Sequence, residues 1–273
     1  MLPWGPKFSA DGVGAYSVLL QYKLTSSWRD GVNTDQEDYG SLAGEGLVKR
    51  IYTDNISSAR ATLSAEASEF RKSGVATIRS LIKYPLVRAL YYYSVARSNS
   101  GTMRSDSQVP GTPAAYADPA MEELLSRTQV LIENVAGVEV YPTYSYFRVY
   151  KYADVLPRHT DRPACELSLT VCLGYIPDQP WPIWVDAQAG PRSIALMPGD
   201  ALLYRGTEIA HWRDSFEGTQ AAQVFLHYVS KSGSHSGCRF DMRQNLSTLD
   251  RCGVGHRILE ALDRFIKAAI VPS

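Results

Sequence analysis

The chain has 273 residues and is 45% hydrophobic, which is enough to bury a sizeable core in one large domain or a domain with a helical annex. Lys plus Arg and Asp plus Glu number 28 each, so the formal net charge is zero, whereas a general nucleic-acid binder is expected to carry a basic excess. The N-terminal residues lack the apolar run that a signal peptide or a membrane span requires. We therefore expect a cytoplasmic protein with no nucleic-acid and no membrane partner; the sequence does not indicate an oligomeric state.

The cysteine pattern contains no CxxC pair, which favours reduced, mostly buried thiols over a disulfide framework. The two later cysteines lie near His235 and His256, but their spacing fits no zinc finger. The four cysteines are Cys165, Cys172, Cys238 and Cys252.

Residues 1–138 are predicted to form a helical annex, with helices joined by polar loops. A helix is expected over residues 57–72, ending before Gly74, and the Ser-, Gly- and Asp-rich residues 98–113 are expected to form a mobile loop. The clearest helix has Asp118 as N-cap and Pro119 as its first residue, and it ends at Gly137. Its apolar positions follow the 3.6-residue period: Met121, Leu124, Leu125, Val130, Leu131 and Val135.

Residues 139–232 change to short strand-like runs separated by turn residues, which predicts an antiparallel sandwich or barrel. Residues 233–273 are predicted to form a C-terminal extension with a helix over 246–269, so that the whole chain makes one structural domain. The predicted strands cover residues 138–141, 144–150, 166–173, 183–185, 193–196, 201–204 and 221–228.

A metal-binding pattern centres on His159, Thr160 and Asp161. Side chains i and i+2 of an extended segment point to the same side, so His159 and Asp161 can direct a nitrogen and an oxygen toward one point. A third ligand must come from elsewhere, and His211 follows Asp161 by 50 residues, shortly after a strand-like run. Two histidines and one carboxylate on one face of an octahedron are the ligand set of non-haem Fe(II) oxygenases.

The sequence around these residues resembles the 2-oxoglutarate/Fe(II) dioxygenase superfamily, in particular its prolyl-hydroxylase-like branch. The resemblance covers about residues 140–232 and is carried by RVYKYADVLPRHTD, MPGDALLY and HWRDSFEGTQAAQVFLHYV. It implies an α+β fold with a double-stranded β-helix (jelly-roll or cupin-like) core. The metal ligands of that family carry over to His159, Asp161 and His211, and its co-substrate-contacting tyrosine carries over to Tyr150.

The resemblance further implies Fe(II), the co-substrates 2-oxoglutarate and O2, and ascorbate as an accessory reductant. The expected activity is hydroxylation of a small-molecule substrate, which the neutral charge and the lack of a peptide- or nucleic-acid-binding module lead us to expect is amino-acid-like. Desaturation or cyclisation by the same chemistry remains open, as does a metal-binding or sensor protein without turnover. Asp161 argues against a halogenase, since the related halogenases have a small residue in place of this carboxylate.

One departure from the family concerns the anchor for the far carboxylate of 2-oxoglutarate. Many members carry Arg or Lys about ten residues after the distal histidine, but this chain has Ala221 there. A buried carboxylate without a cationic partner is costly, so another base must serve. Arg213 is the first choice, because it lies two residues after His211 and points to the same side of an extended segment. Arg148 is the second choice, because it lies two residues before Tyr150 and points to the same side as that residue. Thr170 is a further candidate, as a hydroxyl donor.

Other residues near the pattern have weaker functional interpretations. His227 alternates in phase with Gln223 and Phe225, which is more typical of a core histidine than of a substrate contact. Three tryptophans are candidates to line a substrate pocket, with core or rim packing as the equal alternative. They are Trp181, Trp184 and Trp212.

Overall fold

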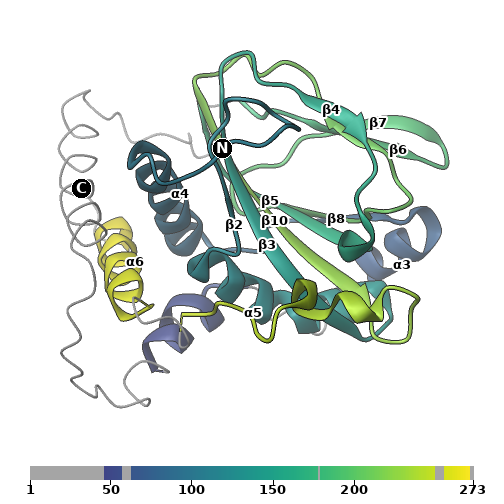
Figure 1. Cartoon of the computed structure of the whole chain (residues 1–273), viewed down its shortest axis with the longest axis horizontal. Coiled ribbons are helices and arrows are strands. Elements are labelled where there is room, and N and C mark those ends of the chain that lie inside the picture. Colours follow the sequence, from purple (N-terminus) through teal and green to yellow (C-terminus); the bar gives the residue numbers. More distant parts are fainter. Residues whose placement is uncertain (1–45, 57–62, 178, 250–254, 271–273) are drawn as a thin grey trace.

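The computed structural model describes residues 46–56, 63–177, 179–249 and 255–270. Ten strands form two antiparallel sheets, which lie beside a layer of helices (Figure 1). The six-stranded sheet has the order β1 (Val75–Ile78), β8 (Ala201–Arg205), β5 (Leu167–Ile176), β10 (Gln220–Ser230), β3 (Val140–Lys151) and β2 (Ala114–Tyr116). The four-stranded sheet has the order β4 (Leu156–His159), β9 (His211–Arg213), β6 (Ile183–Ala187) and β7 (Gly190–Ile194). The expected combination of helices with antiparallel sheet is confirmed.

The two faces of the six-stranded sheet differ because successive side chains of a strand point to opposite faces. On β5, for example, Leu169, Val171 and Leu173 belong to the core cluster that includes the helices. Cys172, one position out of phase, belongs to the cluster that includes β6 of the smaller sheet. Strands β3, β8 and β10 divide in the same way, so the second face is the interior between the sheets.

Helices α4 (Tyr84–Asn99) and α5 (Pro119–Ala136) cover the other face, and α6 (Gly255–Ile270) packs on α4 (Figure 1). The predicted ends of α5 are confirmed. Asp118 accepts a hydrogen bond from the Ala120 backbone N–H at 3.0 Å, and Gly137 ends the helix with a positive φ of 72°. Of the apolar positions that roughly follow the helical period, Val130 is 50% exposed and lies off the buried side of the helix. None of the described helices combines the length and apolar character needed to cross a membrane.

The N-terminal annex contains more than the predicted helices and loops. Strands β1 and β2 extend the six-stranded sheet at its two edges, and α4 occupies a stretch where no helix was specified. The helix expected over 57–72 is α3 (Ser64–Ser73), ending at Gly74 as predicted, while residues 57–62 lie outside the described part. These edge strands were missed because three or four residues are too few to show a period.

Several boundaries in the β region also differ from the prediction. The runs at 138–141 and 144–150 are one strand, β3, and its pairing with β10 shifts register between Leu226 and Tyr228. Pro142, which lies between the two predicted runs, pairs with Tyr228 just beyond this shift. Strands β4 and β9 were not predicted as strands at all.

The C-terminal helix is shorter than expected. Residues 246–249 are not helical, and α6 begins at Gly255; residues 250–254, including Cys252, lie outside the described part. Ile258, Leu259, Leu262 and Ile266 form the buried side of this helix. The Phe265 and His256 side chains are not described.

A turn before β8 depends on the buried carboxylate of Asp200. It accepts hydrogen bonds from the backbone N–H groups of Ser80 (2.8 Å) and Met197 (3.0 Å) and pairs with Arg79 at 2.7 Å. Alanine at Asp200 is expected to lower the free energy of unfolding by about 2–4 kcal/mol, because two backbone N–H groups and Arg79 lose a buried carboxylate as their acceptor. Urea denaturation measures this. Asp186→Ala, which breaks an ion pair with exposed Arg158, is the control and should cost at most about 1 kcal/mol.

Candidate metal centre

Two strands of the smaller sheet place His159 and His211 side by side. His159 ends β4 and His211 begins β9, and the two residues are direct partners in the antiparallel ladder. Their ring centroids lie 4.2 Å apart. The pairing explains how two histidines so far apart in the chain reach one place.

Asp161 lies two residues beyond the end of β4. Its backbone N–H donates to the Gly206 carbonyl at 2.8 Å, which fixes the segment against the end of β8. Its Oδ1 is 3.7 Å from His159 Nε2 and 3.6 Å from His211 Nε2. The three donor atoms lie within 4.8 Å of one another, as a metal-ligand set requires. The residues that the sequence pattern singled out are therefore brought together.

Both imidazoles are oriented by backbone carbonyls. His159 Nδ1 donates to the Pro157 carbonyl at 2.7 Å, and His211 Nδ1 donates to the Ile209 carbonyl at 3.1 Å. Because Nδ1 carries the proton, each Nε2 keeps its lone pair for a ligand role. Burial, followed by repulsion from His159, lowers the pKa of His211 to about 3, so the ring is neutral at pH 7. A neutral ring is the form that binds a metal.

Glu166 and Asp154 are close to Asp161 in the sequence, but both carboxylates are engaged elsewhere. Glu166 accepts a hydrogen bond from the Ser230 backbone N–H at 3.0 Å. Asp154 accepts one from the Thr112 hydroxyl and one from the Lys151 backbone N–H, both at 2.7 Å. Each is engaged in holding its own loop, and neither belongs to the ligand group described above.

Arg213 is a buried cation without a carboxylate partner among the described residues. It is 1% exposed, donates to the Trp181 carbonyl and lies over the Trp181 ring at 4.9 Å. It also donates to Gln223 Oε1 at 3.4 Å, while its Nε has no partner. Burial lowers the pKa of Arg213. Such a group is costly unless an anion compensates its charge.

Tyr150 and Thr170 add unpaired hydroxyls to the same interior. Both side chains are fully buried, and neither Tyr150 Oη nor Thr170 Oγ1 has a hydrogen-bond partner. They lie on the interior face of the six-stranded sheet, where Ala221 of β10 pairs with Tyr150 and Phe225 pairs with Thr170. Burial raises the pKa of Tyr150, while the charges of Arg148 and Arg213 act in the opposite direction. Orphaned buried polar atoms of this kind leave hydrogen-bonding capacity that a water molecule or a ligand can use.

Arg148 differs from Arg213 because the protein supplies its counter-ion. It is 2% exposed and makes a bidentate pair with Asp106, at 3.1 and 2.9 Å. It also donates to Gln108 Oε1 at 3.0 Å, and the Gln108 amide lies 2.8 Å from His159 Nε2. The Tyr146 hydroxyl donates to Asp106 as well. Arg148 thus holds the part of the predicted loop at 98–113 that contains Asp106 and Gln108, and Gln108 lies beside the candidate metal centre.

The Arg148–Asp106 pair is expected to control how often this loop opens. Asp106 Oδ1 also accepts the backbone N–H groups of Gln108 (3.0 Å) and Val109 (3.1 Å). Asp106→Asn keeps these acceptors but removes the charge, at a cost of about 1.5–3 kcal/mol, so these amides should exchange about tenfold to a hundredfold faster. Hydrogen–deuterium exchange tests this; unchanged exchange would mean that the ion pair does not hold the loop. Glu208→Gln, which affects an exposed pair with Arg205, is the control.

The three tryptophans lie in two different places. Trp181 contacts Arg213 and lies edge-on to Tyr150 at 4.8 Å, as expected of a pocket residue. Trp184 and Trp212 stack on each other at 5.9 Å. They are out of phase with the interior-facing Val185, His211 and Arg213 of the same strands, so the pocket interpretation is wrong for these two.

Several residues that contact the candidate site were not assigned from the sequence. Asp106 and Gln108 lie in a loop without periodicity, so no sequence signal places them. Tyr204 and Ser168 carried a usable signal, because both occupy interior positions of strands β8 and β5 and pair with each other. The Tyr204 hydroxyl lies 3.3 Å from His211 Nε2.

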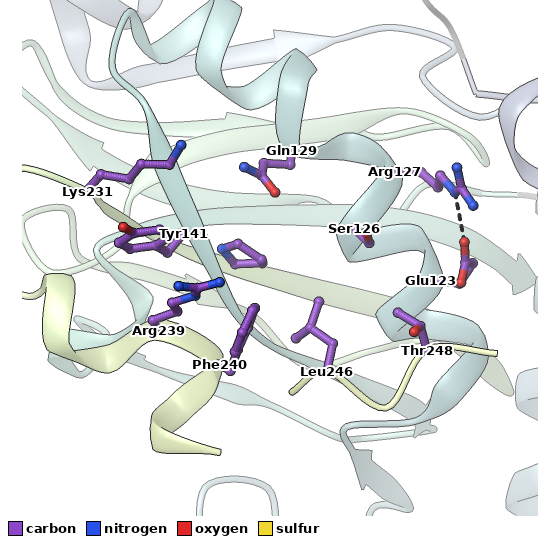
Figure 2. A pocket seen from close by; sticks show the side chains of 11 residues that line it. Glu123, Ser126, Arg127, Gln129, Tyr141, Lys231, Arg239, Phe240, Leu246 and Thr248 are labelled. Carbon is purple, nitrogen blue, oxygen red and sulfur yellow. Dashed lines mark hydrogen bonds and ion pairs between the residues drawn. The ribbon is translucent and has the colours of Figure 1, made fainter. Parts of the chain in front are cut away.

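A separate pocket of about 380 Å³ lies between α5, the start of β3 and the segment after β10 (Figure 2). Its charged side chains already have partners. Arg127 pairs with Glu123 at 2.8 Å, Lys231 with Glu139 at 3.5 Å, and Arg239 lies over the Tyr141 ring at 4.9 Å. None of its lining residues belongs to the candidate metal centre.

No sequence model of a protein family matches the chain, and no curated protein matches it by sequence. Solved structures do match. A Pseudomonas putida prolyl-4-hydroxylase is 17% identical with a TM-score of 0.53, covering 62% of this chain and 99% of the hydroxylase. SnoN, a non-haem α-ketoglutarate-dependent epimerase from nogalamycin biosynthesis, is 13% identical (TM-score 0.54; 63% and 84% covered). A 2OG-Fe(II) oxygenase family oxidoreductase from Burkholderia pseudomallei is 12% identical (TM-score 0.50; 62% and 90% covered). The chain has the fold of the 2-oxoglutarate/Fe(II) oxygenases.

Proposed function

We propose that this protein is a non-haem Fe(II) and 2-oxoglutarate-dependent oxygenase with His159, Asp161 and His211 as its metal ligands. The observation that carries the proposal is the convergence of two imidazole Nε2 atoms and Asp161 Oδ1, with both Nδ1 atoms occupied by carbonyls. Two imidazole nitrogens and one carboxylate oxygen fit Fe(II), whereas the ligands that Mg²⁺ or Ca²⁺ prefer are oxygens.

The proposed anchor for the far carboxylate of 2-oxoglutarate is Arg213. It is supported by the burial of Arg213 without a described carboxylate partner, since a dianionic co-substrate would supply the missing charge. The unpaired hydroxyls of Tyr150 and Thr170 would donate hydrogen bonds to the same anion. Arg148 is disfavoured as the anchor because Asp106 already neutralises it.

When bound, Fe(II) and 2-oxoglutarate would supply O2 activation, with release of succinate and CO2 and oxidation of the substrate. The chain's own contribution is to bind and orient. The carbonyls of Pro157 and Ile209 hold the imidazole rings in their ligand tautomer. Trp181 packs against Tyr150 and Phe216 and shields the Arg213 side of the interior from water. Gln108 covers the His159 side.

We further propose that the two sheets form a double-stranded β-helix in which residues 139–232 are the catalytic core. The interior cluster shared by both sheets supports this assignment. Residues 1–138 and 233–273 would then be the annex and the extension of the same domain. The neutral net charge of the chain supports a small, amino-acid-like metabolite as the substrate.

Hydroxylation is the default outcome, but the same centre supports other outcomes. SnoN, which has the same fold, is an epimerase. The fate of the substrate radical depends on how the substrate lies relative to the metal. Desaturation or cyclisation therefore remains the second candidate.

The proposal is tested by incubating the full chain with Fe(II), 2-oxoglutarate and O2 and measuring succinate. Succinate should form slowly without a substrate and stop when Fe(II) or O2 is omitted. A pooled metabolite library screened by mass spectrometry then identifies the substrate through an O2-dependent change in mass. Metal binding without any succinate formation would favour a metal-binding or sensor protein.

A further inference from the structure

The two carboxylate oxygens of Asp161 have different surroundings. Oδ1 faces the two imidazole Nε2 atoms at 3.7 and 3.6 Å. Oδ2 accepts a hydrogen bond from the Ser168 hydroxyl at 2.6 Å. A bond of this length to a charged acceptor is strong and directional. One oxygen is therefore directed to the metal position, and the other is held by the protein.

Ser168 is itself oriented by a buried histidine. A hydroxyl has one proton, and Ser168 gives it to Asp161 in preference to the Cys165 carbonyl, which lies farther away at 3.3 Å. Ser168 Oγ therefore accepts the hydrogen bond that joins it to His227 Nδ1 at 3.0 Å. His227 must then carry its proton on Nδ1.

The His227 ring is held in place from several sides. His227 on β10 pairs with Ser168 on β5, which brings the two side chains together across the ladder. The ring of Tyr144 lies 4.6 Å from the His227 ring, and Arg162 lies 4.5 Å over Tyr144. The Ser168 hydrogen bond and the Tyr144 ring both favour the orientation in which Nδ1 faces Ser168.

Gly206 closes the remaining side of the carboxylate. A Cβ atom at this position would overlap Asp161 Oδ2, Ser168 Oγ and the Cys165 carbonyl. The close approach of the Gly206 backbone leaves Asp161 Oδ2 with Ser168 as its side-chain partner. The absence of a side chain at Gly206 is thus part of the same arrangement.

We propose that Ser168 and His227 are positioning residues that hold Asp161 as a one-oxygen ligand directed at the metal. The inference rests on the proposed function, because it assumes that the metal binds His159, Asp161 and His211. Groups that orient a metal ligand through a hydrogen bond are worth about 10–100-fold in metal affinity. His227 thus has a role at the centre, in place of the plain core role expected from its sequence pattern.

A second metal ion is a competing explanation, because Asp161, Cys165 and His227 also lie within 4.8 Å of one another. The hydrogen bonds argue against it. Cys165 Sγ is bonded to the Tyr144 hydroxyl at 3.0 Å, and His227 Nδ1 is bonded to Ser168.

The test is titration of Co(II) into the metal-free full chain, followed by calorimetry and by the visible ligand-field spectrum. Ser168→Ala should weaken Co(II) binding by about 10–100-fold and change the spectrum, because Asp161 is then free to bind through both oxygens. Ser168→Thr keeps the hydroxyl and should restore both properties. Cys165→Ala should leave the stoichiometry at one metal per chain; loss of a second bound ion would favour the competing explanation.

Two substitutions at His227 separate positioning from packing. Asn places an N–H close to where Nδ1 lies, whereas Phe keeps the ring against Tyr144 and removes the donor. His227→Asn should therefore bind Co(II) nearly as wild type does, and His227→Phe should bind it about tenfold more weakly. Wild-type affinity and spectrum in Ser168→Ala, or equal losses in the two His227 variants, would overturn the inference. Failure of the wild-type chain to bind Co(II) would instead overturn the proposed function.

Discussion

His211→Ala is expected to lower Fe(II) affinity by more than about 100-fold and to abolish succinate formation. The expectation follows from geometry, because His211 Nε2 is one of three converging ligand atoms. Burial also lowers the pKa of His211, which keeps the ring neutral at pH 7. Loss of a direct ligand should exceed the cost of about 10–100-fold seen for groups that only orient a ligand. Anaerobic calorimetry with Fe(II) measures the effect. His159→Ala should behave in the same way.

The matched control is His235→Ala, which removes a histidine outside the ligand group described above. Its Fe(II) affinity should equal that of the wild type. Fe(II) occupancy near the wild-type level in His211→Ala would remove His211 from the ligand set. For Asp161→Ala we expect loss of hydroxylation, with chloride able to bind at the vacated position. Full activity in that variant would point to Glu166 or Asp154, although both hold other loops.

The second large effect concerns Arg213. Arg213→Met is expected to raise the dissociation constant for 2-oxoglutarate by about two to four decades while Fe(II) affinity stays near the wild-type value. The reason is that removing one partner of a buried ion pair costs about 3–5 kcal/mol. Arg213→Lys keeps the charge but loses the two-pronged geometry, so its affinity should be intermediate. Calorimetric titration of 2-oxoglutarate without O2 into the Fe(II)-loaded wild type, Arg213→Met and Arg213→Lys measures the three dissociation constants.

Arg148→Met is the control for this prediction, because Arg148 is also buried and near Tyr150 but is neutralised by Asp106. Arg148→Met should loosen the loop that contains Asp106, and it should change the affinity for 2-oxoglutarate only slightly. The reverse result, with a large loss of affinity in Arg148→Met and none in Arg213→Met, would move the anchor to β3. No effect in either variant would place 2-oxoglutarate itself in doubt.

The sequence predicted that His159, Asp161 and His211 come together, because the signals that mark these residues are local. The spacing of His159 and Asp161 needs only an extended segment, and His211 follows a recognisable turn and strand. The helix from Pro119 to Ala136 was predicted to the residue, because Asp118, Pro119 and Gly137 mark its ends by their own backbone chemistry. Each of these signals lies within a few residues of the side chain or helix end that it marks.

The features that the sequence did not reveal depend on contacts between distant segments. Whether Arg148 or Arg213 is free to bind an anion is decided by Asp106, which lies more than 40 residues from Arg148 in a loop without pattern. The role of His227 likewise depends on its partner across the sheet, Ser168. The alternation of side chains along each strand showed that these side chains face the interior. It did not show which of them contact one another.

The most direct measurement is the anaerobic calorimetric titration of 2-oxoglutarate into the wild-type chain with and without Fe(II). The proposed centre predicts one 2-oxoglutarate per chain in the presence of Fe(II), and binding at least about tenfold weaker in its absence, because the co-substrate would bind both the metal and Arg213. Fe(II) binding at the three ligands with no binding of 2-oxoglutarate would contradict the assignment of this protein as a 2-oxoglutarate-dependent oxygenase.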